Sequence, residues 1–159
     1  MHISALEEYG VRCILELARN YEKKQLPASE IAKSEGLSIE YVSKILHLFR
    51  KTGLITATRG INGGFTLIRS PEKVFLKEVF ECLNKTQDDS SDWCAKRKKK
   101  SVKCTHGAEC SVRPVWTLIN TYLDNILSSI SLDELVHTEA HTRDFLGILT
   151  TQTKQHQPN

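Results

Sequence analysis

Residues 27–69 read PASEIAKSEGLSIEYVSKILHLFRKTGLITATRGINGGFTLIR, and this stretch decides the fold. Its first half predicts two short helices, over residues 27–35 and 39–52, with Gly36 ending the first and Ser38 capping the second. The second helix has an apolar stripe on one side and polar residues on the other. Two short helices joined by a turn that holds glycine indicate a helix-turn-helix.

The second half of the stretch predicts a β-hairpin. Residues 54–58 and 65–69 are rich in β-branched and aromatic residues, and they flank an Asn-Gly-Gly turn whose glycines would supply positive φ. A helix-turn-helix followed at once by such a hairpin is typical of a winged helix. The fold class that we expect is therefore mainly α with a small β-hairpin wing.

A winged helix places its second helix in the major groove of double-stranded DNA, and its wing against the backbone or the minor groove. Arg59, at the base of the wing, suits a narrow minor groove or a phosphate. On the helix and its end, the DNA-contacting candidates are Ser38, Tyr41, Ser43, Lys44, Arg50 and Lys51. Which of them read bases and which hold phosphates stays open.

The regions on either side of this stretch are also helical by pattern. Residues 4–20 carry an apolar stripe with Ser4 as the expected N-cap, and residues 72–84 predict a short strand or turn followed by a helix. Cys13 and Cys82 lie on or near these stripes, so we expect both thiols to be core residues rather than ligands.

The longest regular pattern runs over residues 115–130, where apolar residues recur at helical spacing for four turns. This stripe is longer than one small winged helix can bury, so we expect it to pack against its own copy in a two-fold homodimer. Packing within the monomer is the alternative. A short last helix is expected over residues 131–136, and the residues after Leu149 read as an irregular tail.

The chain has 159 residues, a formal net charge of +3 and five cysteines. The mild charge permits a nucleic-acid partner without demanding one. The start, MHISALEEYGVR, has acidic residues where a signal peptide needs an apolar run, and no apolar run approaches the roughly 20 residues of a membrane helix. We therefore expect a cytoplasmic protein with reduced thiols and no membrane partner.

Three of the five cysteines, Cys94, Cys104 and Cys110, lie in an aperiodic segment with C-x9-C-x5-C spacing. Six basic residues stand between the first two. Cysteines clustered in a reducing compartment favour metal binding or redox chemistry over disulfides. This loop is the expected functional centre outside the DNA-binding unit.

The sequence resembles the bacterial winged-helix repressors that include the iron–sulfur cluster assembly regulator and the nitric-oxide-sensing repressor. The resemblance rests on YGVRCILELA, EIAKSEGLSIEYVSKIL, GLITATRGINGGFTL and CSVRPVW, in that order along the chain. It implies a homodimer built on the long helix, an iron–sulfur cluster in the cysteine loop, and control of transcription. In many members the loop is C-x5-C-x5-C, so the first interval is four residues longer here.

The resemblance also guides the choice of ligands. Some members have a histidine ligand three residues after the last cysteine, where this chain has Arg113. Others use an acidic residue of the first helix, supplied by the partner subunit, and Glu8 matches that position. We therefore expect Cys94, Cys104, Cys110 and Glu8 to hold a [2Fe-2S] or [4Fe-4S] cluster. His106 is the other candidate for the fourth ligand.

These expectations define a homodimeric, cluster-controlled repressor that senses redox state, nitric oxide or iron–sulfur supply and binds a roughly palindromic operator. The alternatives are a zinc site and metal-free redox-sensing thiols. An enzyme is not expected, since no nucleotide loop, Ser/His/Asp arrangement or carboxylate pair is evident. The expected divisions are the winged helix (1–75), a connecting helix and linker (76–92), the cysteine loop (93–111), the dimerisation and short helices (112–137), and the tail (138–159).

Overall fold

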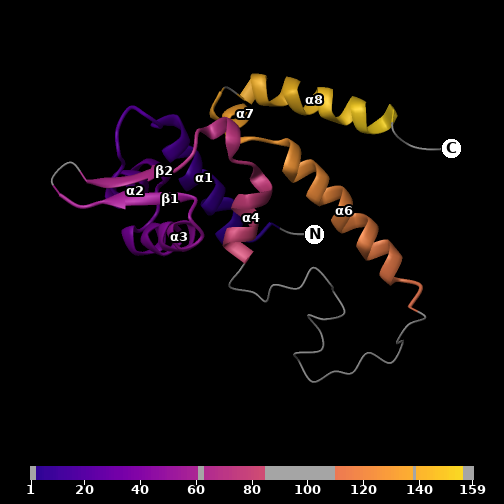
Figure 1. Cartoon of the computed structure of the whole chain (residues 1–159), viewed down its shortest axis with the longest axis horizontal. Coiled ribbons are helices and arrows are strands. Elements are labelled where there is room, and N and C mark those ends of the chain that lie inside the picture. The colour runs from indigo at the N-terminus through magenta and orange to yellow at the C-terminus, as the bar shows by residue number, and fades with distance from the viewer. Residues whose placement is uncertain (1–2, 61–62, 85–109, 138, 156–159) are drawn as a thin grey trace.

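The computed structural model describes residues 3–60, 63–84, 110–137 and 139–155, and the side chains as far as residue 148. In those parts the chain is mostly helical with one two-stranded antiparallel sheet (Figure 1). The elements are, in order, α1 (Ala5–Arg19), α2 (Ala28–Glu35), α3 (Ile39–Lys51), β1 (Ile55–Thr58), β2 (Gly64–Leu67), η1 (Pro71–Lys73), α4 (Leu76–Asn84), α6 (Arg113–Ser129), α7 (Leu132–Val136) and α8 (Glu139–Gln155). The expected fold class, mainly α with a hairpin wing, is confirmed.

Helix α1 begins at a capping box. The Ser4 hydroxyl accepts a hydrogen bond from the Glu7 backbone N–H, and the Glu7 carboxylate accepts one from the Ser4 backbone N–H at 2.7 Å. Partial burial acts to raise the pKa of Glu7, but the hydrogen bonds from Ser4 and Asn84 outweigh it and lower that pKa. The buried face of α1 includes Cys13 and Ile14, so the prediction that Cys13 is a core thiol is confirmed.

The helix-turn-helix consists of α2, a tight turn and α3. Gly36 ends α2 in the left-handed region, with φ 66°, where a glycine has no Cβ to strain the backbone. The Ser38 hydroxyl then accepts a hydrogen bond from the Tyr41 backbone N–H at 3.2 Å and caps α3. Pro27, which the sequence predicts as the first helical residue, is instead the N-cap, and α2 begins one residue later at Ala28.

The wing is the β1–β2 hairpin, in which Ile55 pairs with Leu67 and Thr58 with Gly64. The expectation that the glycines of the Asn-Gly-Gly segment supply positive φ is wrong for the two that are described. Positive φ occurs earlier, at Gly60 (φ 122°). Gly63 and Gly64 are needed for close approach instead.

The two wing glycines meet different parts of the backbone. A Cβ at Gly63 would lie 2.3 Å from the Thr58 carbonyl oxygen, and one at Gly64 would lie 2.7 Å from the Leu26 carbonyl carbon. Leu26 exchanges two backbone hydrogen bonds with Phe65, which attaches the segment before α2 to the hairpin. Asn62 lies outside the described residues.

One hydrophobic core joins α1, α2, α3 and the hairpin with α4 and α7. Backbone hydrogen bonds from Leu76 to the Ile130 carbonyl and from Leu132 to the Val74 carbonyl fasten the α6–α7 junction beside η1. Leu132 is fully buried, which contributes about 2 kcal/mol to stability. Helix α7 therefore belongs to the same core as the winged helix.

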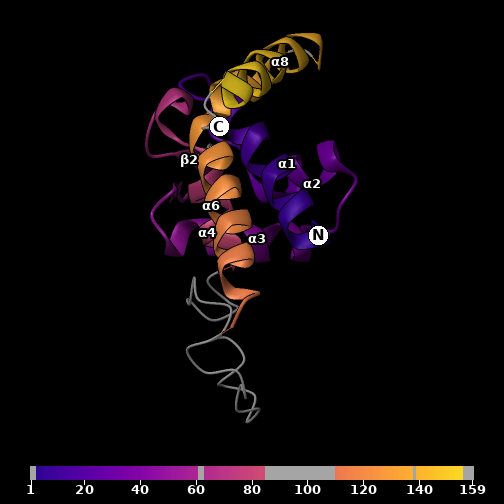
Figure 2. The same cartoon turned by 90° about the vertical axis from the view of Figure 1, so that its right-hand side faces the viewer.

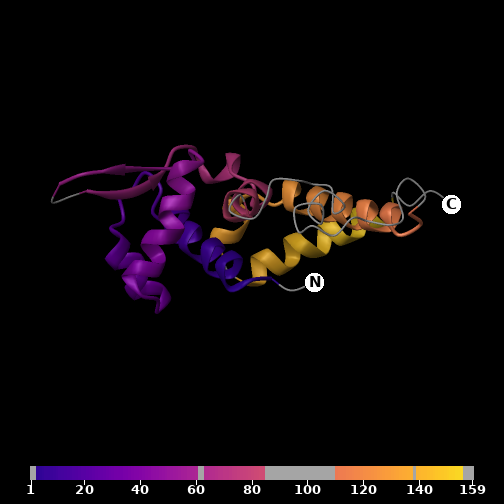
Figure 3. The same cartoon turned by 90° about the horizontal axis from the view of Figure 1, so that it is seen from below.

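Helix α6 extends away from this core, as Figure 1 shows, and Figure 2 views the molecule from the side on which α6 lies. None of its residues is buried. Seen from below in Figure 3, the hairpin projects from one end of the molecule, whereas α6 and α8 lie toward the other. The chain thus separates its wing from its long apolar helix.

The expectation of an irregular tail after Leu149 is wrong as far as Gln155, because α8 spans Glu139–Gln155. Two contacts explain a helix there. Arg143 forms an i,i+4 ion pair with Glu139 at 2.5 Å, and the Thr142 hydroxyl donates a hydrogen bond to the Glu134 carbonyl of α7 at 3.2 Å. These contacts hold the first turns of α8, from which the helix continues to Gln155.

Candidate nucleic-acid interface and cluster ligands

The exposed side of α3 is the candidate DNA-reading surface. Its opposite side is in the core, where Val42, Ile45, Leu46 and Phe49 are fully buried. This packing leaves the sequence-predicted residues Ser43, Lys44, Arg50 and Lys51 exposed. A helix held by one face and polar on the other can enter a major groove without losing core contacts.

Ser38 and Tyr41, also predicted from sequence, have structural roles in addition. The Ser38 hydroxyl caps α3, although its own O–H remains able to donate to a phosphate. Tyr41 is half-buried, and its ring meets that of Tyr9 edge-on, with centroids 6.0 Å apart. Tyr41 therefore joins the start of α3 to α1.

Arg59 is exposed at the point where β1 ends and the wing turn begins. The neighbouring residue, Thr58, accepts a hydrogen bond from the Gln25 side chain at 3.1 Å, which attaches this strand to the segment before α2. Arg59 is thus carried on a hairpin tied to the core, as a wing contact requires.

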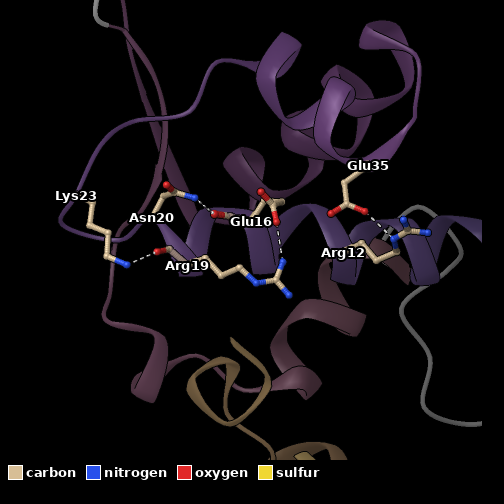
Figure 4. Close-up of polar contacts among 6 residues, drawn as sticks. All are labelled: Arg12, Glu16, Arg19, Asn20, Lys23 and Glu35. Atoms are coloured by element: carbon tan, nitrogen blue, oxygen red, sulfur yellow. Dashed lines mark hydrogen bonds and ion pairs between the residues drawn. The ribbon is translucent and has the colours of Figure 1, made fainter. Parts of the chain in front are cut away.

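Glu8, the expected fourth cluster ligand, lies on the exposed side of α1, where 59% of its side chain is accessible. Its described partner is Arg12, one helical turn away, at 3.9 Å. Arg12 makes a much closer contact with Glu35, the last residue of α2, at 2.6 Å (Figure 4). Because the Arg12–Glu8 contact is long and exposed, it holds the Glu8 carboxylate only weakly.

Arg12 thereby links α1 to the helix-turn-helix. The hydrogen bond to Glu35 raises the pKa of Arg12, and the guanidinium also lies over the Tyr9 ring, 5.6 Å from its centroid. The sequence does not predict the Arg12–Glu35 contact, because the two residues are 23 positions apart and only the tertiary fold brings them together. The Glu8–Arg12 spacing of four was visible in the sequence.

Of the expected cysteine ligands, the structure describes Cys110, which is half-buried just before α6. Its carbonyl accepts a hydrogen bond from the Arg113 backbone N–H at 3.2 Å. Cys94, Cys104 and His106 lie outside the described residues. Within the described ranges, no three His, Cys, Asp or Glu side chains form a group that could hold a metal ion.

Cys13 and Cys82 are not available as ligands. Burial, together with the nearby Glu35 carboxylate, raises the pKa of the Cys13 thiol to about 12. The Cys82 thiol is buried and hydrogen-bonds to the Thr52 hydroxyl at 2.8 Å. The prediction that both are core residues is therefore confirmed.

The apolar stripe of α6 is exposed, as its length suggests. The side chains of Val115, Leu118, Ile119, Tyr122 and Ile126 each expose 41–56% of their surface. Leu123 and Leu127 are half-buried on the side where Lys77 of α4 pairs with Asp124 at 3.6 Å. The monomer thus covers one side of α6 and leaves an apolar side uncovered.

None of the helices in the described ranges has the length and apolar character that crossing a membrane would require.

Two relatives are bacterial regulators named HTH-type transcriptional regulator IscR. That of Klebsiella pneumoniae is 27% identical over 157 residues, covering 99% of this chain and 88% of its own, and that of Xenorhabdus nematophila is 27% identical over 139 residues, covering 87% and 81%. These relatives are transcription regulators and not enzymes, which confirms that expectation.

Solved structures share the fold. CymR, described as the global cysteine regulator of B. subtilis, aligns with a TM-score of 0.68 at 23% identity, covering 86% of this chain and 96% of its own. T. potens IscR aligns with a TM-score of 0.67 at 24% identity, covering 86% of each chain. At this identity they establish the winged-helix fold alone.

A family model, Rrf2, described as an iron-dependent transcriptional regulator, matches residues 3–138. This span includes the helix-turn-helix, the wing, the cysteine segment and α6. The chain therefore belongs to the Rrf2 family of winged-helix transcription regulators.

Proposed function

We propose that this regulator is a cytoplasmic homodimer that represses transcription from a roughly palindromic operator, and that an iron–sulfur cluster controls its DNA binding. The observation that carries the proposal is an exposed α3 face with an arginine-bearing wing, in a chain whose family is described as iron-dependent. The IscR relatives support it by their names.

The cluster would be held by Cys94, Cys104 and Cys110, with Glu8 of the partner subunit as the fourth ligand and His106 as the alternative. The donor chemistry fits as far as it is described. Cys110 is partly accessible, and the contact of the Glu8 carboxylate among the described residues, with Arg12, is long at 3.9 Å. Thiolates suit iron, and a carboxylate completes the set as its weakest bond.

A bound cluster would supply a centre that oxidants or nitric oxide can alter. This chain's own residues would then transmit the change. If Glu8 leaves Arg12 for the cluster, Arg12 is left with Glu35 at the end of α2, and the Tyr9–Tyr41 ring contact joins the same part of α1 to the start of α3. A ligand on α1 could therefore bias how the two α3 helices of a dimer are spaced.

The test is anaerobic purification followed by iron and sulfide determination, with DNA binding measured before and after exposure to oxidant or nitric oxide. We expect a brown protein with visible absorption whose DNA affinity changes on exposure. Cys110→Ser should abolish the colour. Cys82→Ser is the matched control, because it removes a thiol outside the loop and leaves a hydroxyl that can still bond to Thr52.

Glu8→Ala should keep the protein folded and weaken the cluster, whereas Glu22→Ala removes an exposed charge from the turn after α1 and should not weaken the cluster. A protein that contains zinc and no sulfide would favour the zinc site over the cluster. A metal-free protein whose DNA binding responds to thiol oxidation would favour direct sensing by the thiols. A colourless protein that binds no DNA in any state would refute the proposal.

A further inference from the structure

The side of α3 that faces away from the core follows from which residues of the helix are buried. An α-helix turns 100° per residue, so the side opposite Val42, Ile45, Leu46 and Phe49 is formed by positions 40, 44, 47 and 51, which are four, three and four residues apart. These are Glu40, Lys44, His47 and Lys51, and all four are exposed. Glu40 is the first of these four residues along the chain and the second residue of α3.

Glu40 is the single acidic residue of α3, and no basic side chain of the described residues pairs with it. Within the described ranges its carboxylate has no ion pair or hydrogen bond, although Lys44 stands one helical turn away. Other carboxylates of the neighbouring helices are paired, as Glu16 is with Arg19 and Glu35 with Arg12, both at 2.6 Å. An unpaired carboxylate therefore lies in the first turn of α3, on the same side of the helix as the positively charged Lys44 and Lys51.

Against DNA, such a charge is unfavourable unless it meets a donor. Phosphates repel a carboxylate, so Glu40 weakens the sequence-independent attraction that the lysines provide. In the major groove, however, the N4 amino group of cytosine donates a hydrogen bond that a carboxylate accepts. The first residues of a recognition helix are those that reach base edges.

We propose that Glu40 is a specificity-determining residue that reads the N4 amino group of a cytosine in each half-site. The proposal rests on the DNA-binding function proposed above, with α3 in the major groove. A simpler role for an acid in a first helical turn is to stabilise the helix dipole. That role affects stability alone and cannot change which base is preferred.

The experiment is selection from a library of random-sequence duplexes by the wild-type protein, Glu40→Gln, Glu40→Ala and the control Glu72→Gln, which removes an exposed charge of η1. Each protein is tested both cluster-loaded and metal-free. We expect the wild type and Glu72→Gln to select cytosine about tenfold over other bases at one symmetric position. Glu40→Gln should shift that position to adenine, because an amide pairs with adenine N6 and N7.

Glu40→Ala should lose the preference at that position while binding non-specific duplex more tightly than the wild type. Identical base preferences for the wild type and Glu40→Gln, with or without a lower melting temperature, would overturn the inference and leave the proposed function intact. If the wild type enriched no sequence in either form, both would fail.

Discussion

At the scale of single residues, close packing between helices gives the sharpest expectations. Gly10 of α1 faces Leu83 of α4, and a Cβ built on it would lie 2.5 Å from a Leu83 methyl carbon. Leu83 is itself 1% exposed, so it has little room to move. The absence of a side chain at Gly10 is what lets α1 and α4 approach.

Gly10→Ala should therefore lower the free energy of unfolding by about 1–3 kcal/mol, the usual cost of overpacking a core. Urea unfolding followed by circular dichroism measures it. Gly147→Ala in α8 is the matched control, because a Cβ there meets nothing within 4 Å and alanine is the better helix former. Equal effects of the two substitutions would show that the α1–α4 contact is looser than the structure indicates.

Cys13 gives the second expectation at this scale. Burial raises its pKa from the ordinary value of 9.0 to about 12, so the folded thiol stays protonated at neutral pH. Between pH 9 and 12 the unfolded chain loses this proton while the folded chain keeps it, and the contribution of Cys13 to stability falls as the pH rises.

Iodoacetamide labelling at pH 8, read by peptide mass spectrometry, should therefore modify Cys13 only after unfolding in guanidinium chloride. In metal-free protein, Cys110 should be labelled without denaturant, because it is partly accessible. Rapid labelling of Cys13 in the folded protein would contradict its burial.

At the scale of elements, the hairpin and α3 are expected to act on DNA mainly through charge. Removing one phosphate contact should reduce the slope of the logarithm of affinity against that of salt concentration by about 0.9. Arg59→Ala should do so for both specific and non-specific duplex, since a backbone contact carries no base information.

Fluorescence anisotropy across a salt series checks this effect. Arg143→Ala removes an exposed cation from α8, at a distance from the wing, and should leave the slope unchanged (Figure 1). An unchanged slope for Arg59→Ala would mean that the wing does not contact DNA.

At the scale of the whole molecule, the exposed stripe of α6 is expected to be the dimer contact. Ile119→Asp places a charge within that stripe, where burial against a second copy would cost several kcal/mol. We expect the variant to sediment as a monomer in analytical ultracentrifugation while its circular dichroism stays that of the wild type.

Ser128→Asp introduces the same charge at an exposed position of α6 outside the stripe and should remain dimeric. A dimeric Ile119→Asp variant would require a different interface. A wild-type protein that sediments as a monomer would contradict the homodimer in the proposed function.

Much of the architecture was predictable because it depends on local chemistry. The caps at Ser4 and Ser38, the glycine at the end of α2 and the hairpin each follow from residues near in sequence. The exposed DNA-face candidates followed from helical periodicity in the same way. The helical state of residues 139–155 could not be predicted in this way, because the first turns of α8 are held by contacts with α7 and by the ion pair between Glu139 and Arg143.

The sequence by itself determined which elements form and which of their faces are apolar, since capping, glycine conformation and hydrophobic period act within a few residues. Only the tertiary structure decided that Arg12 of α1 meets Glu35 of α2 and that α7 enters the winged-helix core. Both are contacts between segments that are distant in the chain. The packing of the whole core decides which segments meet, and no local pattern of residues does so.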